Sequence, residues 1–327
     1  MESLVVLQFA ITGVLLVFAM IEGLVLQSRS PGGFDWAEAW LSISDQIGRQ
    51  LLALLPLNLA VPVMAWAWQL RLTTVPLDGW AAFALLFVGL EFFYYWYHRT
   101  AHRVRFFWAS HAVHHSPNQL NLSTAFRLGW TGKLTGSGLF FVPLVLLGFK
   151  PTVVVTALAL NLLYQFWIHS TWIPKLGVLE YVLNTPSAHR VHHASNVDYL
   201  DANYGGVLIV FDRLFGTYVA ERDDLPCVYG LVKPMRSHNL LVVEFHQWMA
   251  LARDLRRTKG WRACAGLLLR PPGWSPEGAH QTTEAMREFQ GAGGTMSIKA
   301  GSGRLQSADG PRMLKPDAQP DVPAAVR

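Results

Sequence analysis

Long apolar runs constrain this chain more than any other feature of its sequence. Leu4–Leu26 is long enough to cross a hydrocarbon core of roughly 30 Å, and Leu51–Leu70 and Trp80–Tyr97 are two further runs of this kind. Gly136–Leu147 and Val153–Ile168 are separated only by GFKP, which predicts a tight hairpin of two short spans or one re-entrant element. Because a helix satisfies its own backbone hydrogen bonds, the runs predict an all-α, polytopic membrane protein with about four to five transmembrane or re-entrant helices.

Composition agrees with a membrane protein. Only 15% of the 327 residues are charged and 51% are hydrophobic, whereas soluble domains carry about 25% charged residues. A cleaved signal peptide is the alternative interpretation of Leu4–Leu26, but it has no basic segment before it and no small-residue cleavage motif, so we expect a retained helix. Cys227 and Cys264 indicate neither a disulfide framework nor a thiolate metal site. We assign the net charge of +5 to membrane topology, and we expect no nucleic-acid partner.

Eight of the twelve histidines lie in three short motifs, HRTAH, HAVHH and HRVHH. They are His98, His102, His111, His114, His115, His189, His192 and His193. On a helix, residues three or four positions apart share a face, so each motif can direct two or three imidazoles toward one point. Imidazole is the commonest protein ligand of transition metals. Three such helical turns predict a site for two metal ions with about four to six ligands each.

The identity of the metal follows less directly. A zinc hydrolase typically has three protein ligands and a glutamate next to them, as in HExxH, and that motif is absent. Iron with dioxygen suits a site made only of nitrogen ligands better, although residue types alone leave zinc and manganese open. A surface location of the histidines is the alternative interpretation. One HxxxH motif occurs often by chance, but two HxxHH motifs together with HxxxH, following apolar spans, do not.

Lysine and arginine residues predict the orientation in the membrane. With the amino terminus outside, only Arg71 and Lys150 lie in outer loops, and the inner side receives most of the basic residues, including the stretch Arg253–Arg270. All three histidine motifs then lie in a cytoplasmic, helical cap. Leu240–Leu269, which mixes apolar and basic residues, is expected to lie along the membrane interface. Asn203–Tyr218 is expected to form a short strand-like or packed segment beside the site.

The motifs and their surroundings resemble the fatty acid hydroxylase/sterol desaturase superfamily. The similar segments, between Glu91 and Leu231, include YYWYHRTAH, SHAVHHSPNQLNLSTAFR, LYQFWIHS, LNTPSAHRVHHASN and YLDANYGGVLIVFDRLFGTY. Leu163–Tyr218 is especially similar to the alkylglycerol monooxygenase branch. The resemblance implies a di-iron centre held by the eight motif histidines, which are then also the catalytic residues, with His169 as a ninth ligand. It implies dioxygen as co-substrate and hydroxylation of a C–H bond in a membrane lipid, such as a fatty acyl chain, a sterol or an ether or amino lipid.

Electrons have to come from a partner, because the glycines at 291–303 form no nucleotide fingerprint and no C-x-x-C cluster is present. A reductase or small electron carrier is implied, and for the alkylglycerol monooxygenase branch a reduced pterin. Three alternatives remain open: a desaturase using the same site, a zinc-dependent membrane hydrolase or isomerase, and a metal transporter or storage protein. A transporter would need ligands along a path between spans, whereas these ligands follow the ends of spans.

Other polar residues are weaker candidates. His246 is equally well a ligand or an ordinary residue and is left out of the metal set, and His238 and His280 are expected at the surface. Glu91, two helical turns before His98, is a candidate for orienting a ligating imidazole, and an intramembrane acid paired with a nearby arginine is the alternative. Asp201, Asn203 and Asp212 are candidates for the same role near the third motif, with turn and capping chemistry as the alternative.

The sequence predicts four regions along the chain. They are N-terminal transmembrane helices at 1–75, the oxygenase domain at 76–235, an interfacial helical segment at 236–282 and a disordered tail at 283–327. A multi-pass protein of a bacterial inner membrane is expected, or of the endoplasmic reticulum if the source is eukaryotic. The sequence gives no indication of an oligomeric state.

Overall fold

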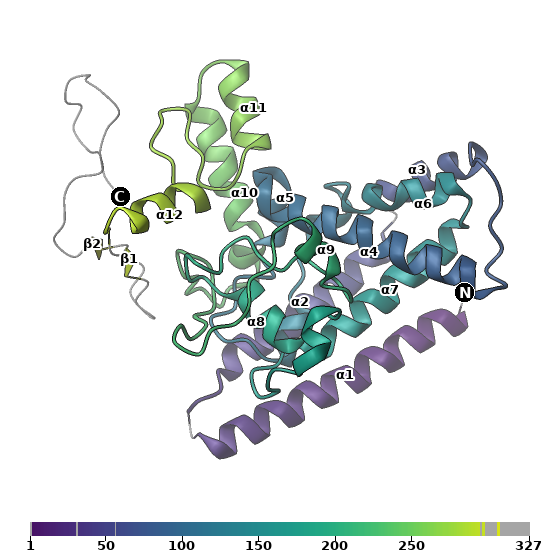
Figure 1. The fold of residues 1–327 in the computed structure, drawn as a ribbon, viewed down its shortest axis with the longest axis horizontal. Coiled ribbons are helices and arrows are strands. Elements are labelled where there is room, and N and C mark those ends of the chain that lie inside the picture. Colours follow the sequence, from purple (N-terminus) through teal and green to yellow (C-terminus); the bar gives the residue numbers. More distant parts are fainter. Residues whose placement is uncertain (1, 31, 56, 295, 298–305, 308–327) are drawn as a thin grey trace.

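Helices are the main secondary structure of this protein. The computed structural model describes residues 2–30, 32–55, 57–294, 296–297 and 306–307. Most of the helices pack together into one body (Figure 1). The only strands among the described residues are an antiparallel pair, β1 (Met296–Ser297) and β2 (Gln306–Ser307). The predicted all-α class is confirmed.

Three helices are long and apolar enough to cross a membrane. They are α1 (Glu2–Arg29), α4 (Trp80–Arg103) and α7 (Pro151–Ile168). The segments Leu122–Lys133 and Ser137–Leu147 form a pair bent by 92°, which adds a fourth crossing if the pair is one broken span. The described chain therefore contains three to four candidate spans, slightly fewer than the sequence predicts.

The predicted span Leu51–Leu70 is wrong. Helix α2 (Trp36–Ala53) ends inside this run, and α3 (Ala60–Gln69) begins after a break. The 10 residues of α3 rise about 15 Å, half the thickness of a hydrocarbon core of roughly 30 Å. The sequence has a proline at position 56, and proline lacks an N–H group and disfavours helix in the residue before it.

The predicted hairpin forms, and its two arms differ. The first arm is η3 (Ser137–Phe141) followed by α6 (Val142–Leu147), and it belongs to the bent pair. The second arm is α7, which is long enough to span alone. Gly148 turns the chain between them with φ +120°, and a Cβ at this position would lie 2.5 Å from the carbonyl oxygen of Thr73.

The main apolar core lies between α3, α4, α6 and α7. Leu90 and Tyr94 of α4 pack there against Phe141, Leu144 and the residues around them. Because α4 carries the first histidine motif at its end, this packing fixes the position of that motif relative to α7. Helix α4 continues beyond Tyr97, where the apolar run ends, and so includes His98 and His102.

Short elements surround the ends of these helices. The elements are α5 (Arg105–His111), η1 (Leu122–Phe126), η2 (Trp130–Lys133), η4 (Gly177–Tyr181), α8 (Pro186–His193) and α9 (Val210–Leu214). Two of them, α5 and α8, carry histidines of the second and third motifs. The segment Asn203–Tyr218 was expected to be strand-like or packed beside the site, and it is packed beside the site. It is a loop leading into α9, with a single bridge between Leu208 and Leu183.

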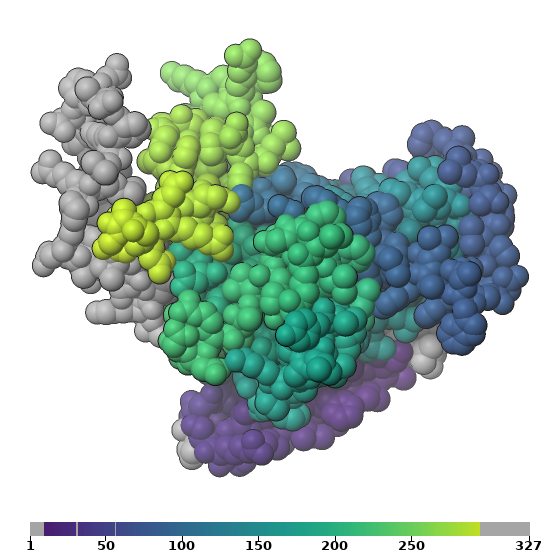
Figure 2. All heavy atoms as spheres, in the orientation of Figure 1, coloured from purple at the N-terminus to yellow at the C-terminus, as the bar shows by residue number. Residues whose placement is uncertain are grey.

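The C-terminal helices stand out from this body on the side away from α1, as Figure 2 shows. The expected interfacial helix is two helices, α10 (Leu240–Arg257) and α11 (Trp261–Leu269), separated at Gly260, whose φ is +87°. Helix α12 (Thr283–Gly291) occupies the start of the tail predicted to be disordered, because the Thr282 side chain caps it and Met286 is buried. Most of the rest of that tail lies outside the described residues.

Candidate metal centre

All nine histidines named as ligands from the sequence come together in two groups, within each of which the ligand nitrogens lie within 4.8 Å of one another. Eight of the nine are buried and His111 is half-buried. The five-histidine group consists of His98, His102, His111, His115 and His192. The four-histidine group consists of His114, His169, His189 and His193.

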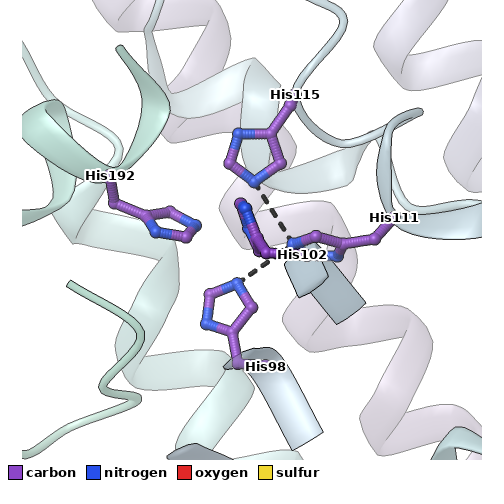
Figure 3. A group of neighbouring side chains, drawn as sticks. All are labelled: His98, His102, His111, His115 and His192. Carbon is purple, nitrogen blue, oxygen red and sulfur yellow. Dashed lines mark hydrogen bonds between the residues drawn. The ribbon is translucent and has the colours of Figure 1, made fainter. Parts of the chain in front are cut away.

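The five-histidine group draws on three helices and one turn (Figure 3). His98 and His102 come from α4, His111 ends α5, His115 lies in the turn that follows, and His192 comes from α8. The Nε2 atom of His111 is 3.0 Å from that of His98 and 3.2 Å from that of His115. Two ligands at right angles on an ion, with bonds of about 2.1 Å, are separated by about 3.0 Å. The nitrogens are thus spaced as ligands of one ion.

The four-histidine group has the same spacing. The Nε2 atom of His169 lies 3.3 Å from that of His114 and 3.0 Å from that of His189. His193 Nε2 is 3.1 Å from His189 Nε2. His169 follows α7 directly as its C-cap residue, so the end of a candidate span supplies one member of this group.

Of the two or three imidazoles that each motif could direct toward one point, two share a group in every motif. The pairs four positions apart stay together: His98 with His102, His111 with His115, and His189 with His193. The neighbours His114 and His115 separate into different groups, as do His192 and His193. On a helix, neighbouring side chains point about 100° apart, whereas residues four apart share a face.

Backbone carbonyl groups fix the orientation of four of the rings. His98 donates from Nδ1 to the carbonyl oxygen of Tyr204 at 2.9 Å. His192 donates from Nδ1 to the carbonyl oxygen of Ala202, also at 2.9 Å. His114 donates in the same way to Arg127 (2.9 Å), and His169 to Gln165 (2.7 Å). With the proton on Nδ1, the lone pair of Nε2 points into the group, which is the arrangement typical of metal-binding histidines.

The nitrogens that face inward fit a metal ion. Nε2 of His102 and of His192 are buried without a hydrogen-bond partner among the described residues. Burial, together with a smaller effect of a neighbouring imidazole, lowers the pKa of His114 to about 4 and that of His169 to about 3. These rings are neutral at pH 7, and neutral imidazole is the form that binds metal.

Asp201 lies beside the first motif. Its Oδ1 is 3.6 Å from Nδ1 of His102, and its Oδ2 accepts a hydrogen bond of 2.7 Å from Arg103. Burial alone would raise the pKa of Asp201, but the contacts with His102 and Arg103 hold the pKa below its usual range. The carboxylate is therefore charged and faces the ring nitrogen of His102 that points away from the five-histidine group.

Glu91 contacts no histidine directly, unlike the sequence-based expectation. Its Oε2 accepts the backbone N–H groups of Val207 and Leu208, both at 2.8 Å. Asp212 accepts those of Tyr204 and Gly205, both at 2.7 Å. The two carboxylates hold the loop whose Tyr204 carbonyl group orients His98, so they act on the ring through the backbone.

Asn203 has the turn chemistry that was its alternative reading. Its φ is +58°, and its amide donates to the carbonyl oxygens of Ala188 in α8 (2.9 Å) and of Val219 (2.8 Å). The carbonyl groups that orient the rings escaped prediction, because a backbone acceptor has no signature in a sequence. Sequence reasoning also missed Arg127, whose carbonyl group orients His114 and whose side chain anchors this backbone to α2. The side chain is 1% exposed, and its Nη2 and Nε donate to Glu38 O and Ser42 Oγ.

Two cavities reach the histidines from different sides. The span-side cavity, of about 360 Å³, is lined by parts of α4 and α7 and touches His98, His111, His114 and His169. The C-terminal cavity, of about 650 Å³, is lined by parts of α10 and α12 and touches His102, His115, His192 and His193. Each cavity therefore meets members of both histidine groups.

His246 and His280 belong to the lining of the C-terminal cavity and to neither histidine group. His246 donates from Nδ1 to Val243 O at 2.7 Å, and its Nε2 is buried without a partner among the described residues. His280 is exposed and stacks on Trp274, and His238 is exposed as well, as the sequence predicts for both residues.

The fold and the site define a class: helical membrane proteins with a histidine-rich metal centre at the ends of their spans. A family model for fatty acid hydroxylase matches residues 83–217, and the chain belongs to the fatty acid hydroxylase superfamily, as its motifs predicted. This membership and the histidine groups point to an iron centre.

Individual relatives make the placement more specific. The chain is 38% identical to the alkylglycerol monooxygenase of Homo sapiens over 263 residues, 80% of this chain and 58% of the relative. It is 40% identical to that of Xenopus tropicalis over 206 residues, 63% of this chain and 45% of the relative. It is 31% identical to the ornithine lipid hydroxylase OlsE of Rhizobium tropici over 43% of this chain and 44% of the relative. The chain thus spans about half the length of these relatives. No solved structure matches it.

Proposed function

We propose that this protein is a membrane-bound, dioxygen-dependent lipid hydroxylase with a di-iron centre. The observation that carries the proposal is the division of nine buried histidines into two groups with ligand spacing. Each group would hold one iron ion, with His98, His102, His111, His115 and His192 around one and His114, His169, His189 and His193 around the other. Similarity to two kinds of lipid-modifying monooxygenase and hydroxylase supports a lipid substrate.

The iron ions would supply the dioxygen chemistry needed to insert oxygen into an unactivated C–H bond. The chain itself does three things. Carbonyl groups such as Tyr204 O and Gln165 O keep the proton on Nδ1 and the Nε2 lone pairs directed inward. Burial excludes bulk water, and the span-side cavity leaves room for an apolar chain next to the histidines.

The orientation of the protein in the membrane is proposed from its charge distribution, and the source of electrons from the residues it contains. We propose that the histidine groups lie on the cytoplasmic side, because Arg99, Arg103 and Arg105 accompany the first motif at the end of α4 and basic residues are enriched on that side of a membrane. The sequence provides no electron-carrying centre of its own. An external donor, either a reductase with a small carrier or a reduced pterin, would therefore supply the electrons.

The test combines metal content with lipid analysis. The protein purified in detergent is expected to contain about two irons per chain, and His192→Ala is expected to contain less. Cells that express His192→Ala should lose a lipid that carries one additional oxygen atom and accumulate its precursor. His238→Ala, at an exposed histidine outside both groups and both cavities, is the matched control and should behave as the wild type. Full activity in iron-free protein would refute the proposal, and a product differing from its precursor by two hydrogens would show desaturation instead.

A further inference from the structure

The span-side cavity joins the histidines to a pair of basic residues. Apolar residues such as Phe141, Leu158 and Leu162 line much of this cavity. Its lining also includes Arg49 of α2 and Lys133 of η2. The cavity is thus apolar over much of its wall, bounded by metal-binding side chains in one place and by two cations in another. This is the polarity of an amphipathic ligand.

The two cations lack a carboxylate partner at ion-pair distance. Neither Arg49 nor Lys133 has an ion pair within 4.0 Å in the part of the chain that the structure describes. They are close enough to repel each other. Arg49 donates to Gln46 Oε1, a neutral acceptor.

Two acidic residues face Arg49 from a greater distance. They are Asp45 on α2 and Glu244 on α10. These carboxyl groups lie close to each other, and Asp45 Oδ1 and Glu244 Oε1 are both buried without a hydrogen-bond donor among the described residues. Two like charges buried so close disfavour double ionisation, so the pair retains one proton and carries one negative charge. One negative charge offsets one of the two cations and leaves the second uncompensated at the cavity.

Resting on the proposed function, we propose that the span-side cavity binds a lipid with an anionic headgroup, a phosphate or a carboxylate. Arg49 and Lys133 bind the headgroup, and the hydrocarbon chain lies along the apolar wall toward His98, His111, His114 and His169. Arginine and lysine are the usual partners of such anions, arginine through its planar fork of donors and lysine as a point charge.

The location of this cavity suits a ligand that arrives from the bilayer. Two of the candidate spans, α4 and α7, line it. Its lining residues Leu57, Leu134 and Leu162 are 47%, 47% and 41% exposed, which gives acyl chains an apolar surface to contact. The C-terminal cavity includes only the end of α4, at His102, and no residue of α1 or α7.

The experiment measures binding rather than turnover. Purified full-length protein in an uncharged detergent is titrated with hexadecyl phosphate, hexadecan-1-ol and inorganic phosphate. Hexadecyl phosphate is expected to bind roughly ten-fold more tightly than hexadecan-1-ol, the effect of one charge-assisted hydrogen bond. Inorganic phosphate should compete weakly, because it lacks the chain.

Two pairs of variants locate the site. Lys133→Gln should lose roughly ten-fold in affinity for hexadecyl phosphate and none for hexadecan-1-ol, whereas the exposed Lys150→Gln should match the wild type. Gly132→Leu should weaken both ligands, because Gly132 lines the cavity and a Cβ there meets its nearest neighbours only at 3.7 and 3.8 Å. Gly79→Leu, with no atom within 4 Å of its Cβ, is the control.

Three outcomes would overturn the proposal: equal affinity for the phosphate and the alcohol, equal losses in Lys133→Gln and Lys150→Gln, or competition by inorganic phosphate as strong as that by hexadecyl phosphate. Iron is measured in the same preparations. If the binding pattern holds in protein without iron or oxygenase activity, the proposed function fails and the lipid site stands. If the enzyme hydroxylates a lipid and Lys133→Gln binds normally, the lipid site alone fails.

Discussion

His114 and His115 are neighbours in the chain, yet their rings are nearly perpendicular, at 84°, and face different histidine groups. His192 and His193 behave in the same way, at 88°. An HH pair is therefore a branch point, at which one element supplies one imidazole to each histidine group. This geometry explains why two of the three motifs end in HH.

The branch point predicts separate effects on the two ions. His115→Ala removes a ligand from the five-histidine group and His114→Ala removes one from the four-histidine group, so each variant should lose up to half of the iron. The two residual irons should give different spectra, since each has different ligands. Elemental analysis and Mössbauer spectroscopy measure this, with His238→Ala as the control. Identical residual spectra in the two variants would contradict the division into two groups.

Asp201 is expected to increase the metal affinity of the five-histidine group through its contact with His102. Asp201→Asn retains the size of the side chain and removes the charge beside Nδ1 of His102. Loss of such an outer contact typically lowers metal affinity by about 10–100-fold. Competition with a chelator measures the change, and Asp223→Asn, whose carboxylate is exposed and pairs with Lys175, is the control. Unchanged iron retention in Asp201→Asn would show that the contact has no role in binding.

The loop that orients His98 is expected to tolerate no added methyl group at Gly205. A Cβ there would lie 2.2 Å from the carbonyl oxygen of Leu208, so the backbone has to move and the Tyr204 carbonyl moves with it. Gly205→Ala should lower both the melting temperature and the iron content. Gly79→Ala, at an open position, should change neither. A Gly205→Ala variant with normal iron content would refute the coupling.

The carboxyl pair between α2 and α10 predicts a dependence of stability on pH. Burial and then the neighbouring Asp45 raise the pKa of Glu244 from 4.5 to about 10. Between these values the folded chain keeps a proton that the unfolded chain has released, so the free energy of unfolding falls as the pH rises. The melting temperature measured across this range should therefore decline. Glu244→Gln, which stays neutral, should flatten the decline, whereas the exposed Glu288→Gln should not. Equal slopes in both variants would contradict the shared proton.

The sequence predicts which histidines lie together better than it predicts the membrane spans. All nine ligand candidates gather in two groups. The three pairs spaced by four residues stay together because this spacing on a helix is a local property that survives tertiary packing. The span over Leu51–Leu70 fails because hydropathy counts apolar residues and ignores the break before α3. Helix α12 was missed for a related reason: its few apolar residues become buried only by packing on the rest of the chain.

Glu91 illustrates what spacing cannot provide. Two helical turns place it on the same face as His98, which suggested a direct contact. The structure fills the intervening space with the loop Tyr204–Leu208, more than a hundred residues later in the chain. A contact of that separation depends on the complete fold.

The two cavities share no lining residue, and the histidines lie between them. A molecule in the C-terminal cavity therefore leaves the span-side cavity free. In kinetic terms, two reactants that use separate openings form a ternary complex in either order. If a lipid occupies the span-side cavity as proposed, an inhibitor that fills the C-terminal cavity is expected to be non-competitive with it, so that raising the lipid concentration does not relieve the inhibition.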